Sequence, residues 1–266
     1  MPAAWSLVLA YYNEAAYLPA TLKALAAQDF RSFTLILIDN ASTDGSAAIA
    51  RDTMSKYTDV DVVYLEDKRP GQLNALETGL ARVATEYVAI CDADTIYPPH
   101  YLSTANRLLT HASDKFVAAL AFGVGADPTE RRSRIRRFIY AKIIARILRF
   151  QAHDGGFGYC FRTAALMKVG GYAPQHWQHV LADHELMNRV FRMGQAVYDP
   201  DFWCQPSDRR PDSPSTRWNL LERILYHATP FALKDWYFYR FLGPRFQQRK
   251  MSALNYRTDR NWEAGA

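Results

Sequence analysis

The fold is decided by the stretch Tyr87-Val88-Ala89-Ile90-Cys91-Asp92-Ala93-Asp94, in which an apolar run leads directly into two aspartates. Side chains of a strand alternate between its faces, so Asp92 and Asp94 are expected to point the same way. Two like charges beside an apolar sheet repel each other and are costly to desolvate. A divalent cation removes this penalty, and Mg²⁺ or Mn²⁺ commonly joins protein carboxylates to a substrate phosphate. The stretch therefore predicts a metal–phosphate site at the end of a buried strand.

The sequence around this stretch alternates between two patterns. Apolar, strand-like runs predict strands over residues 5–11, 33–38, 60–65 and 87–91, and segments of helical periodicity separate them at 15–27, 47–56 and 72–83. Strands joined by helix-length crossovers form parallel, doubly wound sheets, whose ligands bind at the carboxyl ends of the strands. The fold class is therefore predicted to be α/β, with a mainly parallel sheet flanked by helices.

Three polar clusters follow predicted strands, namely Tyr12-Asn13-Glu14, Asp39-Asn40 and Asp92-Ala93-Asp94. Any one of them could be a simple turn or helix cap. Three clusters at equivalent positions predict a nucleotide site, because the carboxyl ends of parallel strands meet at one edge. The glycine loops of dinucleotide and P-loop sites are absent from the first turn. We therefore expect a metal and cationic side chains, Lys68 among them, to neutralise the phosphates.

Size and composition are those of a globular protein. The chain has 266 residues, of which 49% are hydrophobic and 22% are charged, enough for a large core in one domain or slightly more. We expect neither a membrane span nor a signal peptide. The cysteines (Cys91, Cys160 and Cys204) are odd in number and far apart, which favours a reducing compartment. The net charge of +5 favours an anionic partner: a nucleotide, an acidic lipid surface or nucleic acid.

The second half of the sequence is less regular. Further strands are expected over residues 115–124, 155–161 and 195–198, and helices over 131–150, 182–193, 217–227 and 231–242. We expect one domain over residues 1–205, with its two halves meeting near 112–113. A helical, aromatic-rich C-terminal extension is expected over residues 206–266.

Taken together, these motifs resemble those of family-2 glycosyltransferases, which have the GT-A fold. The resemblance spans roughly residues 5–200. It is carried by Tyr12-Asn13-Glu14, residues 39–46, Leu73-Asn74-Ala75 with Gly79, Asp92-Ala93-Asp94, Gly170-Gly171-Tyr172, and Ala182-Asp183-His184-Glu185-Leu186 with Arg189 and Gly194. It implies an inverting enzyme that moves a sugar from a nucleoside-diphosphate donor to an acceptor hydroxyl. The donor would occupy the first half of the domain and the acceptor the second.

The resemblance also implies a role for individual residues. Asp39 would recognise the nucleotide base, Asp92 the ribose, and Asp94 the metal, either Mg²⁺ or Mn²⁺. Asp183 matches the catalytic base. Further donor-binding candidates are Tyr12, Glu14 and Lys68, and the acceptor-side candidates are Trp177, His184 and Glu185.

The helical pattern around Asp183 agrees with an inward-facing acid. Asp183 is three, four and seven residues before the apolar Leu186, Met187 and Val190, so all four share one helix face. The alternative is an ordinary first-turn acid that the helix dipole stabilises. Glu185 lies off this face and is the reserve candidate for the base. Trp177 could stack on a sugar or anchor the core.

Two departures from the family pattern bear on the reaction. Ala182 stands where the family usually has a glutamate, which leaves the electrostatic surroundings of Asp183 open. The (Q/R)-x-x-R-W motif of processive members is incomplete, because Pro214 precedes Arg217-Trp218. We therefore expect the transfer of a single sugar.

Residues 131–150 form an unusually basic segment with seven arginines, one lysine and no acid. Ile139, Ile143, Ile147 and Phe150 form an apolar stripe beside the cations. Such a helix could lie on an anionic membrane or pack on the sheet with a solvated basic edge. The aromatic residues 236–241 suit a membrane interface or a dimer contact.

The leading hypothesis is a metal-dependent glycosyltransferase that uses a UDP-sugar and a lipid-linked or surface-polysaccharide acceptor. We expect it in the cytoplasm, peripheral on the inner face of the plasma membrane, with a homo-oligomer left open. The alternatives are a sugar nucleotidyltransferase, which usually has a glycine-rich first turn, and a non-catalytic nucleotide-sugar-binding protein. Nucleic-acid binding would explain the net charge but not the acidic clusters, and is not expected.

Overall fold

The computed structural model describes residues 3–125, 127, 129–152, 155–207 and 219–253. The first part contains β1 (Trp5–Tyr11), α1 (Leu18–Ala26), β2 (Phe33–Asp39), α2 (Ser46–Met54), β3 (Asp61–Glu66), α3 (Gln72–Leu80), β4 (Tyr87–Asp92), β5 (Thr95–Ile96), α4 (Tyr101–His111), β6 (Phe116–Leu120) and β7 (Phe122–Gly123). The second part contains α5 (Arg131–Ile139), η1 (Tyr140–Ile144), α6 (Ala145–Ile147), β8 (Gly158–Arg162), α7 (Thr163–Lys168), α8 (Ala182–Val190), β9 (Gln195–Val197), β10 (Trp203–Pro206), α9 (Leu220–Ala228), η3 (Phe231–Leu233), η4 (Trp236–Leu242) and α10 (Gly243–Gln248).

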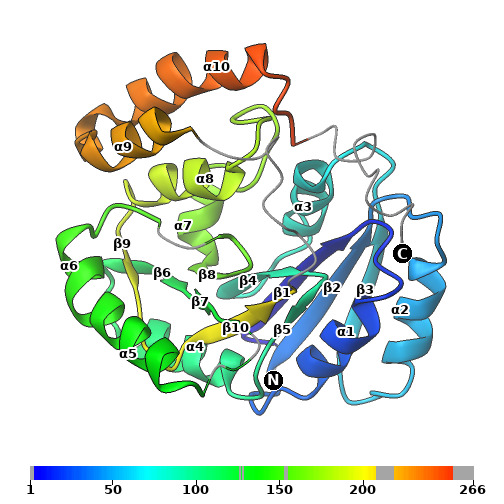
Figure 1. Cartoon of the computed structure of the whole chain (residues 1–266). Coiled ribbons are helices and arrows are strands. Elements are labelled where there is room, and N and C mark those ends of the chain that lie inside the picture. The colour runs from blue at the N-terminus through cyan, green and yellow to red at the C-terminus, as the bar shows by residue number, and fades with distance from the viewer. Residues whose placement is uncertain (1–2, 126, 128, 153–154, 208–218, 254–266) are drawn as a thin grey trace.

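A seven-stranded sheet in the order β3-β2-β1-β4-β8-β6-β9 forms the centre of the molecule (Figure 1). The strands from β3 to β4 are parallel, and β8 runs antiparallel to both of its neighbours, β4 and β6. The predicted α/β class with a mainly parallel sheet is confirmed. The single sheet continues through both predicted halves of the domain.

The central strands β1, β2, β4 and β8 are buried on both faces, as expected for strands covered by helices, whereas the edge strand β3 is partly exposed. All seven residues of β1 are buried, and they alternate between two cores. One core joins Leu7 and Leu9 to α1, α2 and α4, and the other joins Val8 and Ala10 to α3, α7 and α8. Helix α3 lies so close to the sheet that a Cβ on Gly79 would stand 2.6 Å from the Ile38 side chain, so only glycine fits there.

Several elements differ from the expected ones, and helix α7 and strands β5 and β10 were not predicted. Helix α4 follows Pro98-Pro99 and was not predicted. The strand expected over residues 115–124 is divided into β6 and β7, because the chain changes partners at Ala121. The Ala121 N–H donates to the Gly158 carbonyl, whereas the Phe122 N–H donates to Phe202. Strand β7 thereby joins a separate three-stranded sheet in the order β5-β10-β7, and the expected domain boundary after residue 205 falls within β10.

The C-terminal helices lie against α8 over a third apolar core. This core contains Trp177, Val180, Tyr226, Tyr237, Phe238, Leu242, Phe246 and Met251. The side chain of Asn188 on α8 donates to Asp235 at 2.9 Å, which adds a polar contact to the apolar ones. None of the helices in the described part of the chain has the length and hydrophobicity that a membrane crossing requires.

Candidate active site

The carboxyl ends of β2, β1 and β4 bring two predicted donor residues to one edge of the sheet. In the strand register Asp39 pairs with Tyr11, and Asp92 pairs with Ala10 of the same strand β1. Neighbouring strands lie about 4.8 Å apart, so the backbones of Asp39 and Asp92 are separated by roughly 10 Å. This separation suits one ligand that spans two strands.

The loops that follow β1 and β2 are hydrogen-bonded to each other. The Thr43 N–H donates to Asn13 Oδ1 at 2.8 Å, and the Asn13 N–H donates to Ser42 Oγ at 3.1 Å. The Ser42 N–H also donates to the Asp39 carboxylate at 2.9 Å. Asn13 and Ala41 have φ angles of 52° and 60°, a left-handed conformation that is uncommon for residues other than glycine. Strained backbone of this kind often occurs at functional sites.

Two other candidate residues for binding the sugar donor lie in the first of these loops. Tyr12 directly follows β1 and is partly exposed. Glu14 is 4% exposed, and its backbone N–H donates to Ser46 Oγ at 2.8 Å. Glu14 also begins the turn into α1, since its carbonyl accepts from the Leu18 N–H at 2.8 Å. Both residues therefore lie at the edge that carries Asp39.

Asp92 and Asp94 are held by hydrogen bonds from distant parts of the chain. Gln72 Nε2 donates to the Asp92 carboxylate at 3.2 Å, and Ser207 Oγ donates to the Asp94 carboxylate at 2.8 Å. The Ser207 N–H also donates to the Asp94 carbonyl at 3.0 Å. These donors are uncharged, and both aspartates are partly exposed. Their hard oxygen atoms are of the type that Mg²⁺ and Mn²⁺ prefer.

Asp183 lies in the first turn of α8 and packs against the segment before β8. A Cβ on Gly156 would lie 2.8 Å from the Asp183 Cβ, so the two backbones are in close contact. Leu181, just before α8, has a φ angle of 65°, and this second strained position sets the start of the helix. The predicted base is therefore on a tightly fixed part of the chain.

Two buried tyrosines connect the Asp183 region with the end of β4. The Tyr97 hydroxyl accepts from the Asp92 N–H at 2.8 Å and donates to the Phe157 carbonyl at 2.6 Å, next to Gly156. Burial raises the pKa of Tyr172 well above its ordinary value, and the charges of Asp183 and Asp92 add to the rise. The structure thus brings Asp183 toward the edge that carries Asp92.

The phenols around Asp183 are uncharged at neutral pH. Burial raises the pKa of Tyr159 and of Tyr226 far above the usual range, and the negative charge of Asp183 contributes to both shifts. Neutral hydroxyls around a carboxylate neither repel it nor compete with it for a proton.

Lys68 follows the end of β3, where Glu66 pairs with Asp39 in the strand register. Its side chain is 83% exposed, and its ammonium lies 3.8 Å from Glu66. The fixed cation at the end of β3 is the next residue, Arg69, which contacts Asp67 at 2.7 Å and Glu77 at 2.8 Å.

Two of the three acceptor-side candidates are buried. Trp177 is 4% exposed, donates from Nε1 to the Val180 carbonyl at 2.8 Å and packs edge-on against Phe238. Trp177 therefore anchors the core, which is the second of the two roles expected for it from the sequence. Glu185 is 1% exposed and is held by Arg189 through both carboxylate oxygens, at 2.8 and 2.9 Å.

The third candidate, His184, is partly buried. Its Nδ1 lies 3.2 Å from the Tyr226 hydroxyl, which donates to the Ala152 carbonyl. His184 therefore connects the first turn of α8 to α9. Tyr97 and Ser207 were not among the sequence candidates, because their contacts are made across 60 and 113 residues.

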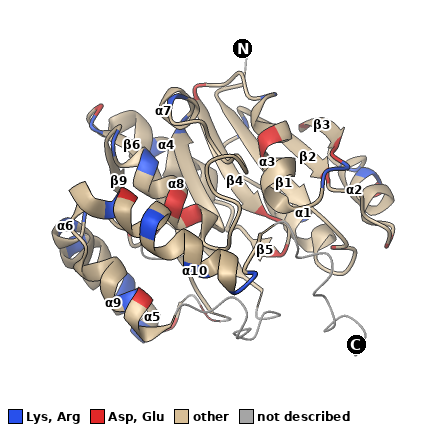
Figure 2. Cartoon of the chain, turned by 90° about the horizontal axis from the view of Figure 1, so that it is seen from above, with Lys and Arg blue, Asp and Glu red and all other residues tan. Residues whose placement is uncertain are grey.

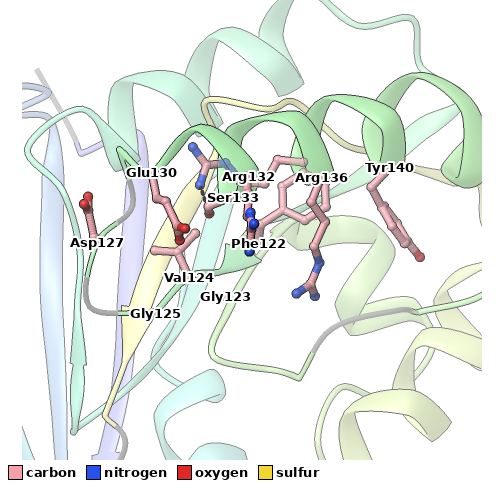
Figure 3. Close-up of a pocket in the computed structure, with 11 residues that line it drawn as sticks. Phe122, Gly123, Val124, Gly125, Asp127, Glu130, Arg132, Ser133, Arg136 and Tyr140 are labelled. Carbon is pink, nitrogen blue, oxygen red and sulfur yellow. Dashed lines mark hydrogen bonds between the residues drawn. The ribbon is translucent and has the colours of Figure 1, made fainter.

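A cavity of about 350 Å³ lies between β7 and the start of α5 (Figure 3). Its lining includes Phe122, Val124, Arg132, Ser133, Arg136 and Tyr140. None of the predicted site residues lines it. Nor does the described part of the chain contain a cluster of three or more His, Cys, Asp or Glu side chains able to hold a metal ion.

Comparison with known proteins now places the chain in a family. The model of glycosyl transferase family 2 matches residues 6–171, more than half of the sequence and the part that carries Asp39, Asp92 and Asp94. The chain belongs to glycosyltransferase family 2. It is 30% identical over 174 residues to the poly-beta-1,6-N-acetyl-D-glucosamine synthase of Staphylococcus epidermidis, a match that covers 62% of this chain and 41% of that protein.

The name of a second relative includes a lipid phosphate. The chain is 28% identical over 146 residues to the undecaprenyl-phosphate 4-deoxy-4-formamido-L-arabinose transferase of Klebsiella pneumoniae, over 54% of this chain and 42% of that protein. The chain thus spans less than half the length of these relatives.

Solved glycosyltransferase structures share the GT-A fold of this family-2 chain. The mannosyltransferase PcManGT of Pyrobaculum calidifontis, in complex with GDP-Man and Mn²⁺, superposes with a TM-score of 0.69 at 20% identity, over 100% of this chain and 77% of that one. TarS of S. aureus (residues 1–349) gives a TM-score of 0.59 at 19% identity, over 93% and 72% of the two chains. At these identities the likeness establishes the fold alone.

Proposed function

We propose that this family-2 glycosyltransferase moves one sugar, with inversion, from a UDP-sugar to a hydroxyl of a lipid-linked or surface-polysaccharide acceptor. The observation that carries the proposal is the convergence of Asp39 and Asp92 on one sheet edge. Asp183 packs on Gly156, and the Tyr97 hydroxyl joins the neighbouring Phe157 carbonyl to the Asp92 N–H. In a direct displacement the sugar donor and the acceptor hydroxyl must be held side by side, so the residues that bind them must lie close together.

In this proposal the donor occupies residues 1–112 and the acceptor residues 113–205. Asp39 recognises the base and Asp92 the ribose, which agrees with their separation of about two strand spacings. Tyr12 and Glu14 lie in the adjoining loop, and Lys68 approaches the phosphates from the surface.

Asp94 is the residue that would hold a divalent cation, Mg²⁺ or Mn²⁺, together with oxygens of the donor diphosphate. Its hard carboxylate fits either ion, and Ser207 fixes one of its oxygens. When bound, the cation supplies positive charge that stabilises the departing diphosphate. In this proposal the oxygens of the donor diphosphate would be further ligands of the cation beside Asp94.

Asp183 takes the proton from the acceptor hydroxyl as its oxygen forms the new bond to the anomeric carbon. The bond between that carbon and the diphosphate breaks on the opposite side, which inverts the configuration. Trp177, His184 and Glu185 act indirectly: the first and last fix α8, and His184 connects it to Tyr226.

The cellular setting is part of the proposal. The relatives named as a polysaccharide synthase and an undecaprenyl-phosphate transferase support an acceptor of the cell envelope. We place the protein in the cytoplasm, peripheral on the inner face of the plasma membrane. Three cysteines without disulfides and the net charge of +5 are compatible with that setting.

Thermal unfolding with nucleoside diphosphates tests the donor half of the proposal. UDP, GDP, CDP and dTDP are each added with and without Mg²⁺ or Mn²⁺. UDP with metal should raise the Tm most, because a ligand at 100 times its Kd stabilises by about 2.7 kcal/mol. Asp94→Asn should abolish the metal-dependent part, whereas the matched Asp183→Asn should retain it. Absence of any stabilisation by UDP or another nucleotide, with either metal, would contradict the proposal.

A further inference from the structure

The segment from α5 through η1 to α6, residues 131–147, is called here the basic helix. It contains six arginines, one lysine and no acid. Only Arg137 and Ala141 are buried within it, so most of its surface faces away from the protein. The charged residues account for the solubility of this helix. They do not account for the apolar residues that are also exposed on it.

Four isoleucines of the basic helix form a stripe that the protein leaves uncovered. Ile135, Ile139, Ile143 and Ile147 are 48%, 43%, 53% and 74% exposed. Residues four apart lie on one helix face, so these side chains are neighbours. The interpretation that this stripe packs on the sheet is wrong. Of the four stripe residues expected from the sequence, only Phe150 packs inward, where it stacks on Phe231 at 4.6 Å between ring centroids.

Cations flank the isoleucine stripe on both sides. Lys142 and Arg146 are exposed along one side, and Arg132 and Arg136 lie on the other, where they line the cavity of Figure 3. No residue in the described ranges forms an ion pair or hydrogen bond with these four side chains. Asp127 and Glu130 line the same cavity as Arg132 and Arg136. Lys142 and Arg146 are exposed, so their charges are available to an external anion.

A second exposed apolar surface adjoins the end of the basic helix. On α9, Leu220, Leu221 and Ile224 are 74%, 52% and 54% exposed. His227 of the same helix contacts Gln151 at 2.8 Å, just beyond the basic helix. Figures 1 and 2 both place α5, α6 and α9 on one flank, at the end of the molecule opposite α2 and β3.

We propose that the basic helix, with the adjoining face of α9, docks on an anionic lipid bilayer. The isoleucines would enter the acyl boundary, while the long cationic side chains reach the lipid phosphates. The inference gives the membrane contact of the proposed function a defined surface, and its test needs neither donor nor acceptor. A failure of docking therefore leaves the transfer chemistry to be judged separately.

Charge complementarity selects the bilayer over other occupants. In a symmetric dimer through this face, the same patch meets itself, so the six exposed cations of one helix would oppose the six of the other. Nucleic acid would satisfy the cations but leave the isoleucines in water. An anionic bilayer supplies both the negative charge and the apolar medium.

Sedimentation with lipid vesicles tests this assignment. The full chain is mixed with vesicles of phosphatidylcholine alone or with about one third phosphatidylglycerol, at low and high salt. We expect binding to the anionic vesicles only, with affinity that falls as salt rises. Ile139→Ser with Ile143→Ser, and Lys142→Gln with Arg146→Gln, should each weaken binding about 10-fold or more. Lys23→Gln with Lys56→Gln, exposed lysines on α1 and just after α2, is the charge-matched control and should bind as the wild type does.

The outcomes separate the possible occupants. All substituted positions are exposed, so thermal unfolding should show unchanged folding in every variant. Binding that is equal in the wild type and both test variants, or absent from anionic vesicles, overturns the assignment. A dimer in solution that the isoleucine variant converts to monomer, without vesicle binding by the wild type, assigns the face to a second copy instead.

Discussion

Gly156 lies directly against Asp183, because a Cβ atom on Gly156 would stand only 2.8 Å from the Asp183 Cβ. Real Cβ contacts are never this short, so Gly156→Ala must displace the first turn of α8. A displacement of about 1 Å at a reacting group can reduce the rate about 100-fold. We expect Gly156→Ala to lower kcat at least 10-fold.

Gly125→Ala is the matched control for this substitution. No atom in the described chain lies within 4 Å of a Cβ at Gly125, so the added methyl group has space. Its kcat should equal that of the wild type. Equal rates for Gly156→Ala and Gly125→Ala would show that the contact with Asp183 does not govern the chemistry.

The ion pair between Glu185 and Arg189 should stabilise the fold without taking part in proton transfer. Glu185 is 1% exposed, so Glu185→Gln leaves the Arg189 charge without its buried partner. Removing one partner of a buried pair costs about 3–5 kcal/mol, which corresponds to a Tm decrease of roughly 6–15 °C. Measured well below the Tm, kcat should change only a few-fold.

The exposed pair of Lys56 and Asp52 has the same four-residue spacing and supplies a control. Asp52→Asn should cost less than about 1 kcal/mol, because solvent screens this pair. A large loss of kcat in Glu185→Gln with an unchanged Tm would instead identify Glu185 as the base.

Lys234 should make stability rise with pH in the alkaline range. Its side chain is 2% exposed, it donates to the Tyr226 carbonyl, and burial lowers its pKa to about 8. The unfolded lysine has a pKa near 10.4, so between about pH 8 and pH 10 the unfolded state binds more protons. Lys234 therefore destabilises the fold below pH 8, and this penalty is relieved as the pH rises through that window.

Denaturant unfolding of the wild type and Lys234→Met, compared from pH 7 to pH 9.5, measures this effect. The wild type should gain up to about 2 kcal/mol relative to the variant over this range. Buried tyrosines titrate identically in both proteins and cancel in the difference. Lys168→Met, at an exposed lysine of α7, should show no such pH dependence. A pH-independent difference for Lys234→Met would refute the assigned titration.

The sequence predicted the donor side of the fold well, for a physical reason. Strands β1 and β4 are continuous apolar runs because both of their faces are covered, and the polar residues that end them mark the sheet edge. The convergence of Asp39 and Asp92 therefore follows from parallel topology alone. The division of residues 115–124 into β6 and β7 did not follow, because a strand that changes sheets keeps an unbroken apolar pattern.

The acceptor side was harder to predict because burial there depends on contacts between distant residues. The sequence around Trp177 does not reveal that its ring packs against Phe238. Nor does it reveal that Glu185 forms an ion pair with Arg189. The contact between Ser207 and Asp94 likewise depends on β10 pairing with β5. Such contacts become visible only in the folded chain.

The rate of sugar transfer by Asp183→Asn, with donor and acceptor both saturating, tests the central claim most directly. Asparagine keeps the shape of the side chain but cannot accept the acceptor's proton. The account predicts that kcat falls about 100-fold to 10,000-fold, while UDP with metal still raises the Tm as in the wild type. A kcat within a few-fold of the wild-type value would contradict it.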